Sequence, residues 1–187
     1  MTRQQKEQER GIRVAEKYGL KKTAEIIRRG GCFGQIFNTA VDECGQAQTV
    51  AIITKSRIPL WAYKLANWLW LDRYDRLTPT LTDKLAKVAI QRRNSHYAAL
   101  FAHLPDITKE LRAELEEVVT SSKDTYAAVL LAELPGIRRE LREQLGKIVL
   151  THGTNADAFW FLDDKKTRRG ISAALRKKLR ALEKSWL

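Results

Sequence analysis

The sequence predicts an all-α protein, an α-solenoid of stacked helical hairpins with a helical N-terminal cap. A segment beginning at His103, "HLPDITKELRAELEEVV", returns as "ELPGIRRELREQLGKIV" at a spacing of 30 residues. Apolar residues in both copies fall at i, i+4, i+8, i+11 and i+12, one stripe of an amphipathic helix. Only 10 Gly and 4 Pro interrupt the 187 residues, which favours helices over a turn-rich β fold.

Residues 1–57 do not share this period, and they are expected to form a basic helical N-terminal cap. The segment "GIRVAEKYGLKKTAEIIRRGG" predicts one or two helices that end at Gly30-Gly31. "GQIFNTAVDECG" and "AQTVAIITKS" each predict a further helix. Such a segment can cover the first repeat, because the terminal units of a repeat array need a polar outer face.

Residues 58–187 are expected to form a repeat domain of about four hairpins. The first pairs "LWAYKLANWLWLDRYDRL" (60–77) with "TLTDKLAKVAI" (80–90). In the next two, "HYAALFAHL" and "TYAAVLLAEL" are first helices with the candidate N-caps Ser95 and Asp124. Pro105-Asp106 and Pro135-Gly136 are expected to start the second helices.

A degraded copy of the repeat closes the chain. "NADAFWFLDD" (155–164) takes the position of the first helix and "GISAALRKKLRALEKSW" (170–186) that of the second. At the same spacing of 30, Ile171, Leu175 and Leu179 align with Leu141, Leu145 and Val149. One hairpin cannot bury its own apolar stripe, so each is expected to pack against the next.

From about residue 58 to the end, the chain resembles HEAT-like helical-repeat proteins. The resemblance lies in the period, the helix-turn-helix unit and the pattern "LP-x-I-x-x-E-L-R-x-x-L". It implies a solenoid but no particular function, and the units here are shorter than typical HEAT units.

Positive charge is the strongest compositional signal. Lys and Arg number 34 against 22 Asp and Glu, for a net charge of +12 and a pI of about 9.9. Residues 105–134 hold seven acidic and three basic residues, whereas 135–187 hold six acidic and thirteen basic ones. This uneven distribution indicates that the charges are organised into faces, which suits a nucleic-acid partner.

The repeat predicts where the phosphates would bind. Arg138-Arg139 open a second helix, and Arg168-Arg169 follow at a spacing of 30, so we expect both pairs on one edge. Arginine suits phosphate because its fork can bond two oxygens. The full set of predicted nucleic-acid-binding residues is Arg138, Arg139, Arg142, Arg168, Arg169, Arg176, Lys177, Arg180, Lys184, Arg28 and Arg29. We therefore expect a non-catalytic protein that binds DNA or RNA without sequence preference.

Two other functions compete with this one. In a protein–protein adaptor, the acidic segment with Glu114, Glu116 and Glu117 would contact a basic partner. The third function comes from a resemblance to helical-repeat DNA glycosylases that remove alkylated bases, in which Trp and Asp reach toward an extruded nucleotide. Here Asp163-Asp164 stand beside Trp160, and Asp72 with Asp75 stand beside Trp70. Asp163 and Asp164 could equally cap a loop or pair with Lys165 and Lys166.

Three smaller patterns have alternative interpretations. Ala15 and Gly19 fit the start of a DNA-binding helix-turn-helix, but Glu25 stands where a buried aliphatic residue belongs. Trp70 and Tyr74, near Arg73 and Arg76, are either core residues or a platform for stacking bases. "RRGGCFGQIF" fits a helix end better than a phosphate-binding loop.

The sequence predicts no cofactor and no metal. His96, His103 and His152 show no set of ligands at metal spacing, and Cys32 and Cys44 form no C-x-x-C. The charged start lacks the apolar stretch of a secretory signal, and no apolar run approaches the ~18 residues of a membrane span. We expect a cytoplasmic protein that does not bind membranes.

Overall fold

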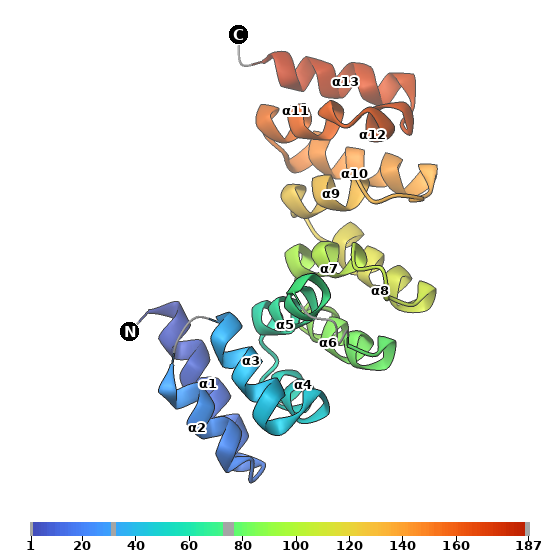
Figure 1. The fold of residues 1–187 in the computed structure, drawn as a ribbon. Helices are drawn as coiled ribbons and strands as arrows, with labels where there is room; N and C mark the ends of the chain where they lie inside the picture. The colour runs from blue at the N-terminus through green and yellow to red at the C-terminus, as the bar shows by residue number, and fades with distance from the viewer. Residues whose placement is uncertain (1, 31–32, 73–76, 186–187) are drawn as a thin grey trace. The chain divides into compact units, whose positions relative to one another are not determined.

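A computed structural model of the chain describes residues 2–30, 33–72 and 77–185, which form thirteen α-helices and no strand (Figure 1). The predicted all-α class is thus confirmed. The helices are α1 (Arg3–Lys17), α2 (Lys21–Arg29), α3 (Phe33–Cys44), α4 (Gln46–Ser56), α5 (Pro59–Asp72), α6 (Pro79–Gln91), α7 (Ser95–Ala102), α8 (Lys109–Thr120), α9 (Thr125–Ala132), α10 (Arg139–His152), α11 (Asn155–Asp163), α12 (Lys165–Arg169) and α13 (Ala173–Lys184).

The chain divides into two compact units. The first comprises Met1–Arg92 with Asp106–Thr108, and the second comprises Arg93–Pro105 with Lys109–Leu187. This division reflects where contacts concentrate, and α1–α6 fall in the first unit while α7–α13 fall in the second. The expected change from cap to repeat after residue 57 concerns sequence periodicity and stays a prediction.

The first unit is built from three consecutive helix pairs. α1 packs on α2, α3 on α4 and α5 on α6, while α3 contacts α5 and α4 contacts α6. The turn between α1 and α2 passes through Gly19, whose φ of 71° is a conformation that side-chain-bearing residues rarely adopt. Ala15 and Ala24 meet Ile52 of α4 in the core below this turn. Glu25 is exposed, whereas a DNA-binding helix-turn-helix has a buried aliphatic residue at this position. The pair α1–α2 therefore departs from that motif.

Gly11 lets α1 approach a buried indole in this unit. Trp61 is 1% exposed and contacts Phe37 edge to face, with ring centroids 6.2 Å apart. A Cβ built on Gly11 would lie 2.5 Å from Cη2 of Trp61, closer than van der Waals contact allows. Only glycine fits there without a shift of the helix or the ring.

The helices of the second unit lie in two rows (Figure 1). The first row is α7, α9 and α11, in which α9 packs on both neighbours. The second row is α8, α10 and α13, in which α10 packs on both neighbours. Equivalent residues fill the space between the rows: Phe101, Leu131 and Phe161 from the first, and Leu115, Leu145 and Leu179 from the second.

The helix starts differ from the predicted ones. Asp124 caps α9 as expected, but Asn94 rather than Ser95 caps α7, and the Ser95 hydroxyl donates instead to Asp124 at 2.6 Å. Pro105-Asp106 and Pro135-Gly136 form turns, and α8 and α10 begin only at Lys109 and Arg139. The delay has a packing reason, because Ile107 and Ile137, which stand between turn and helix, are buried at 6% and 7% exposure.

The degraded copy of the repeat that closes the chain contains the short helix α12, which the sequence did not predict. Its insertion shifts the register, so that Ile171, Leu175 and Leu179 match Ile137, Leu141 and Leu145 at a spacing of 34 rather than 30. The predicted equivalence of Arg168-Arg169 with Arg138-Arg139 is therefore wrong. Ser172 and Ala173 occupy those positions, at the N-cap and first residue of α13.

Replacement of Gly11 by Ala is expected to destabilise the first unit. Overpacking against Trp61 costs about 1–3 kcal/mol, and removing a glycine from a helix returns about 1 kcal/mol, for a net loss of about 1 kcal/mol. Trp61→Phe shortens the ring, so the double variant should lose less stability than the two single variants together. Urea unfolding measures all three, and Arg13→Ala, an exposed site in α1, is the control. Strict additivity would contradict this contact.

Candidate nucleic-acid interface

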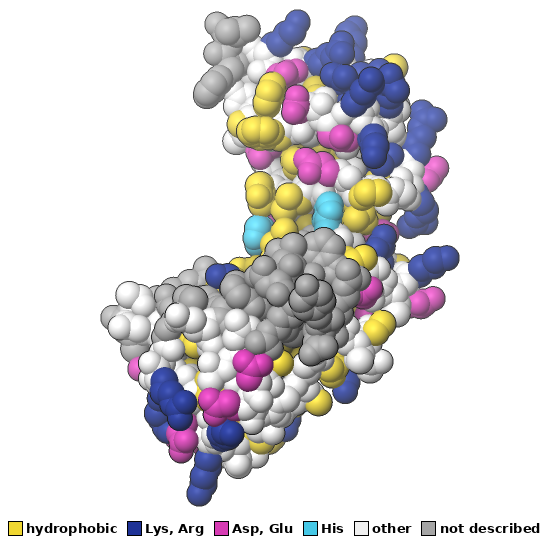
Figure 2. All heavy atoms as spheres, in the orientation of Figure 1, with side chains coloured by type: hydrophobic (Ala, Val, Ile, Leu, Met, Phe, Trp, Pro, Cys, Tyr) yellow, Lys and Arg dark blue, Asp and Glu magenta, His cyan; other side chains and the backbone are white. Residues whose placement is uncertain are grey.

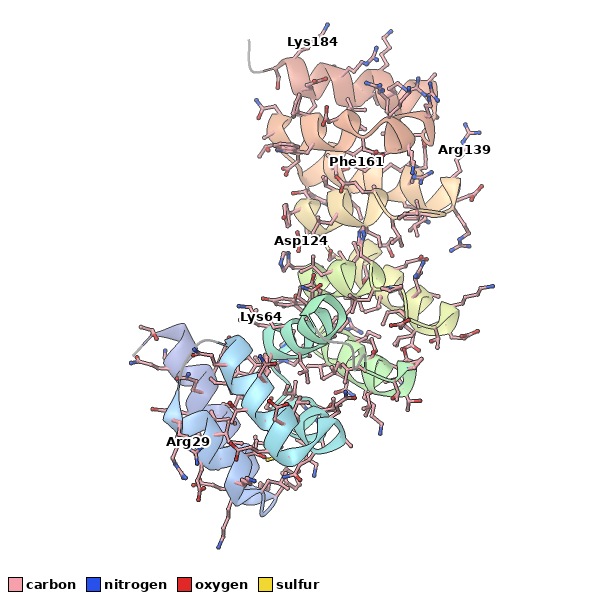
Figure 3. All side chains as sticks on the ribbon, viewed as in Figure 1. Arg29, Lys64, Asp124, Arg139, Phe161 and Lys184 are labelled. Atoms are coloured by element: carbon pink, nitrogen blue, oxygen red, sulfur yellow. The ribbon has the colours of Figure 1, made fainter. Side chains whose placement is uncertain are left out.

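Six basic residues gather around the start of α10 and the short helix α12. We call this set the basic edge; its members are Arg138, Arg139, Lys165, Lys166, Arg168 and Arg169. Figure 2 shows Lys and Arg side chains along this border of the second unit. In Figure 3 the side chain of Arg139 points away from the helices.

The end of α12 lies directly beside the first turn of α10. A Cβ on Gly170 would stand 2.6 Å from Cδ of Arg142, so the chain passes over the arginine stem at van der Waals distance. Gly170 directly follows Arg168 and Arg169, and Arg142 stands one turn after Arg138 and Arg139, so this contact joins the two segments that carry the pairs. That both pairs lie on one edge stays a prediction.

Most of the basic edge is open to solvent. Arg139, Arg169, Lys165 and Lys166 are exposed, and Arg168 is half-buried. Arg138 has a side chain 75% exposed and forms an ion pair at 3.8 Å with Glu116 of α8. The Glu116 side chain is only 16% exposed, so this ion pair is buried on the side of the acid and open to solvent on the side of the arginine.

Two of the predicted binding residues also hold the fold together. Arg142 donates from Nε to the carbonyl oxygen of Ala132 at 3.3 Å, and Thr167 donates to the same oxygen at 3.0 Å. Arg176 donates from Nη2 to the carbonyl oxygen of Ile171 at 3.3 Å. Both side chains are half-buried, so a smaller part of each guanidinium faces solvent than at Arg139 or Arg169.

Asp164 has a structural role. Its carboxylate accepts a 2.5 Å hydrogen bond from the backbone of Thr167 and so caps α12. Burial tends to raise the pKa of Asp164, but the hydrogen bonds from Thr167 and the charges of Arg142 and Lys166 outweigh it and hold the pKa below its ordinary value. Of the alternatives open for Asp164, capping a loop helix agrees with this geometry.

A second basic surface lies on the outer face of α13. Arg176, Lys177, Arg180 and Lys184 line a shallow hollow together with Ala173 and Ala181. The small alanines leave space between the long basic side chains. Figure 3 shows Lys184 near the end of this helix. The opposite face buries Leu175 and Leu179, so the last described helix has an apolar inner face and a basic outer one.

Glu143 fastens α13 to α10. Its carboxylate accepts hydrogen bonds from the backbone of Ser172 at 2.8 Å and from the Ser172 hydroxyl at 2.6 Å. Burial tends to raise the pKa of Glu143, but both bonds from Ser172, with Lys147 and Arg139, outweigh it and lower the pKa. The same hydroxyl caps α13, so one glutamate orients the start of the last helix.

The remaining predicted residues are not part of this edge. Arg28 pairs with Glu16, and Arg29 lies 3.7 Å from Glu43, so both arginines have partners within the first unit.

The predicted aromatic and acidic residues near the end of α5 are not described. The undescribed positions include Arg73, Tyr74, Asp75 and Arg76, and the side chains of Trp70 and Asp72. The proposed stacking platform and the Asp72–Trp70 arrangement therefore stay predictions.

Lys165 and Lys166 were not predicted as members of the edge, because in the sequence they stand next to Asp163 and Asp164, which could pair with them. The one local signal for α12 is Asp164, a residue type favoured at helix N-caps. Without the fold, nothing placed this helix beside α10.

The chain matches no protein-family model, and neither a curated protein nor a solved structure matches it. Within the described residues, no three His, Cys, Asp or Glu side chains group together as a metal ion would require. None of the described helices is both long and apolar enough to cross a bilayer.

Glu143→Gln is expected to weaken the attachment of α13 and to change its pH dependence. A carboxylate with a lowered pKa stabilises the fold above its unfolded-state pKa, and this contribution is lost as the pH falls through its folded-state pKa. The variant should lose about 1 kcal/mol near neutral pH. The difference should shrink below the ordinary glutamate value of 4.5. Urea unfolding across this pH range measures it, with Glu114→Gln as control; a pH-independent difference would contradict the clamp.

Proposed function

We propose that this chain is a non-catalytic nucleic-acid-binding protein, built as a helical-repeat α-solenoid, that contacts phosphates through the basic edge. The observation that supports the proposal is the contact of Gly170, the C-cap of α12, with the Arg142 side chain of α10, because the segments on either side of this contact carry six Lys and Arg residues. Asp164, Glu143 and Glu116 keep their negative charge and offset part of this positive charge, but the six basic residues outnumber these three carboxylates.

The chemistry of the edge favours backbone contact over base reading. Four of its six members are arginines, whose planar forks bond two phosphate oxygens at once. They stand at a helix start and on a helix of five residues, whereas base readout usually requires a long helix or ribbon laid into a groove. Such contacts set affinity and orientation but carry no sequence information. Binding should therefore be similar for all sequences.

Changing Arg138, Arg139, Arg168 and Arg169 together to Ala should weaken binding to every DNA or RNA sequence about equally. Each duplex phosphate contact releases counterions, so log affinity falls with log salt by roughly 0.9 per phosphate. The quadruple variant should bind more weakly and with a slope shallower by up to about three to four units. Fluorescence anisotropy in a salt titration with labelled single- and double-stranded oligonucleotides measures both quantities.

A control variant removes the same charge from exposed lysines of the first unit, Lys17, Lys21, Lys84 and Lys87. It should lose much less affinity and retain most of the slope. Folding of both variants is checked by circular dichroism; Arg138 makes no side-chain capping bond that its loss would remove. If the two variants behave alike, or if the quadruple variant binds as wild type, the basic edge is not the binding surface.

A further inference from the structure

The first row of the second unit carries none of the positive charge of the protein. Helices α7, α9 and α11 contain no Lys or Arg, although the chain has 34. The second row, α8, α10 and α13, contains such residues in every helix. The first row therefore differs from the second, in which α10 and α13 carry more basic than acidic residues and α8 carries four Glu against one Lys and one Arg.

Exposed aromatic side chains stand on this row. Tyr126 of α9 is 56% exposed, and Phe159 and Trp160 of α11 are 46% and 58% exposed. Phe159 and Trp160 contact edge to face with centroids 5.4 Å apart. Tyr126 stacks on His96 of α7 at 5.5 Å and 23°. Large aromatic rings on a protein surface mark interaction sites when they cluster.

Carboxylates stand at the ends of two helices that carry the rings. Glu133 and Asp163 occupy equivalent positions at the ends of α9 and α11, and both are exposed. Burial raises the pKa of Glu133, and repulsion by Asp164 and Asp163 adds to this, while His103 opposes it. The carboxylates of α9 and α11 thus act on one another across the two packed helices. Figure 2 shows hydrophobic and acidic side chains together over these helices.

We propose that the face formed by Tyr126, Glu133, Phe159, Trp160 and Asp163, which we call the aromatic–acidic face, binds a cationic peptide segment of a partner protein. The segment places arginine or lysine side chains against the rings and carboxylates and an apolar residue between them. A cation over an indole or phenol face gains about 0.5–2 kcal/mol, and opposite charges align the partners. Nucleic acid does not suit this face, because its phosphates would meet Glu133 and Asp163.

The rings and the basic edge belong to different helices of one unit, although Asp163 stands only two residues before Lys165 of the edge. The edge lies at the start of α10 and on α12, whereas the rings stand on α9 and α11. A protein with both surfaces brings a cationic protein segment to nucleic acid without competition between the two ligands. Each surface is tested with its own variants, so a negative result for one surface does not contradict the proposal for the other.

The probe is a fluorescein-labelled peptide of alternating leucine and arginine, measured by anisotropy at physiological salt. Glu133→Gln with Asp163→Asn, and separately Tyr126→Ala with Trp160→Ala, should each weaken binding about tenfold or more. The matched control, Glu114→Gln with Glu117→Gln, removes the same charge from exposed positions of α8. It should change the affinity by less than twofold, as should the quadruple arginine variant of the basic edge.

Three results would overturn the proposal. The first is equal weakening in the α8 control, which would mean general charge attraction. The second is unchanged binding in both face variants, or no binding of the peptide to the wild-type protein. The third is self-association in sedimentation that Trp160→Ala abolishes, which would identify a second copy as the occupant. Charge reversal by Glu133→Lys and Asp163→Lys provides a second test if the alanine variants do not fold, since both sites are exposed.

Discussion

Every described feature of the second unit depends on burial of one apolar seam between two rows of helices. Phe101, Leu131 and Phe161 from the first row meet residues such as Leu145 from the second, and all four are at most 1% exposed. An isolated hairpin would leave half of these side chains in water, and each Å2 of apolar area left exposed costs about 25 cal/mol of folding free energy. The stack is therefore cooperative along its length, and the outward faces are free to vary because they take no part in the seam.

The regular parts of this fold could be predicted from sequence, whereas its irregular parts could not. Amphipathic spacing located the helices of the two rows, because the seam imposes the period directly on residues such as Leu111 and Leu141, whereas the short helix α12 was not predicted. Helices α8 and α10 begin later than predicted, because Ile107 and Ile137 are buried by tertiary packing. Local capping rules take no account of such packing. The register of α13 was also wrong, since an inserted helix changes the spacing without changing the stripe.

The candidate site also combines features that could be predicted from the sequence with features that could not. The arginines of the edge could be named from composition and clustering, and their proximity was expected on the basis of a period that does not hold. The backbone of Gly170 lies on the stem of Arg142, a contact between segments that no sequence rule connects. Trp160 and Asp163 were singled out in the sequence, but for a different function, and only the fold shows that Trp160 and Tyr126 are exposed.

In this unit, α12 occupies the place where the other two repeats have a proline turn. The seam tolerates the exchange because Thr167, buried at 1% exposure, reaches the carbonyl of Ala132 and anchors the added residues to the existing helices. The extra segment adds Lys165, Lys166, Arg168 and Arg169 to one border and leaves both rows intact. An insertion in the inter-helix turn thus changes the surface charge of one border while the packing between the two rows stays the same.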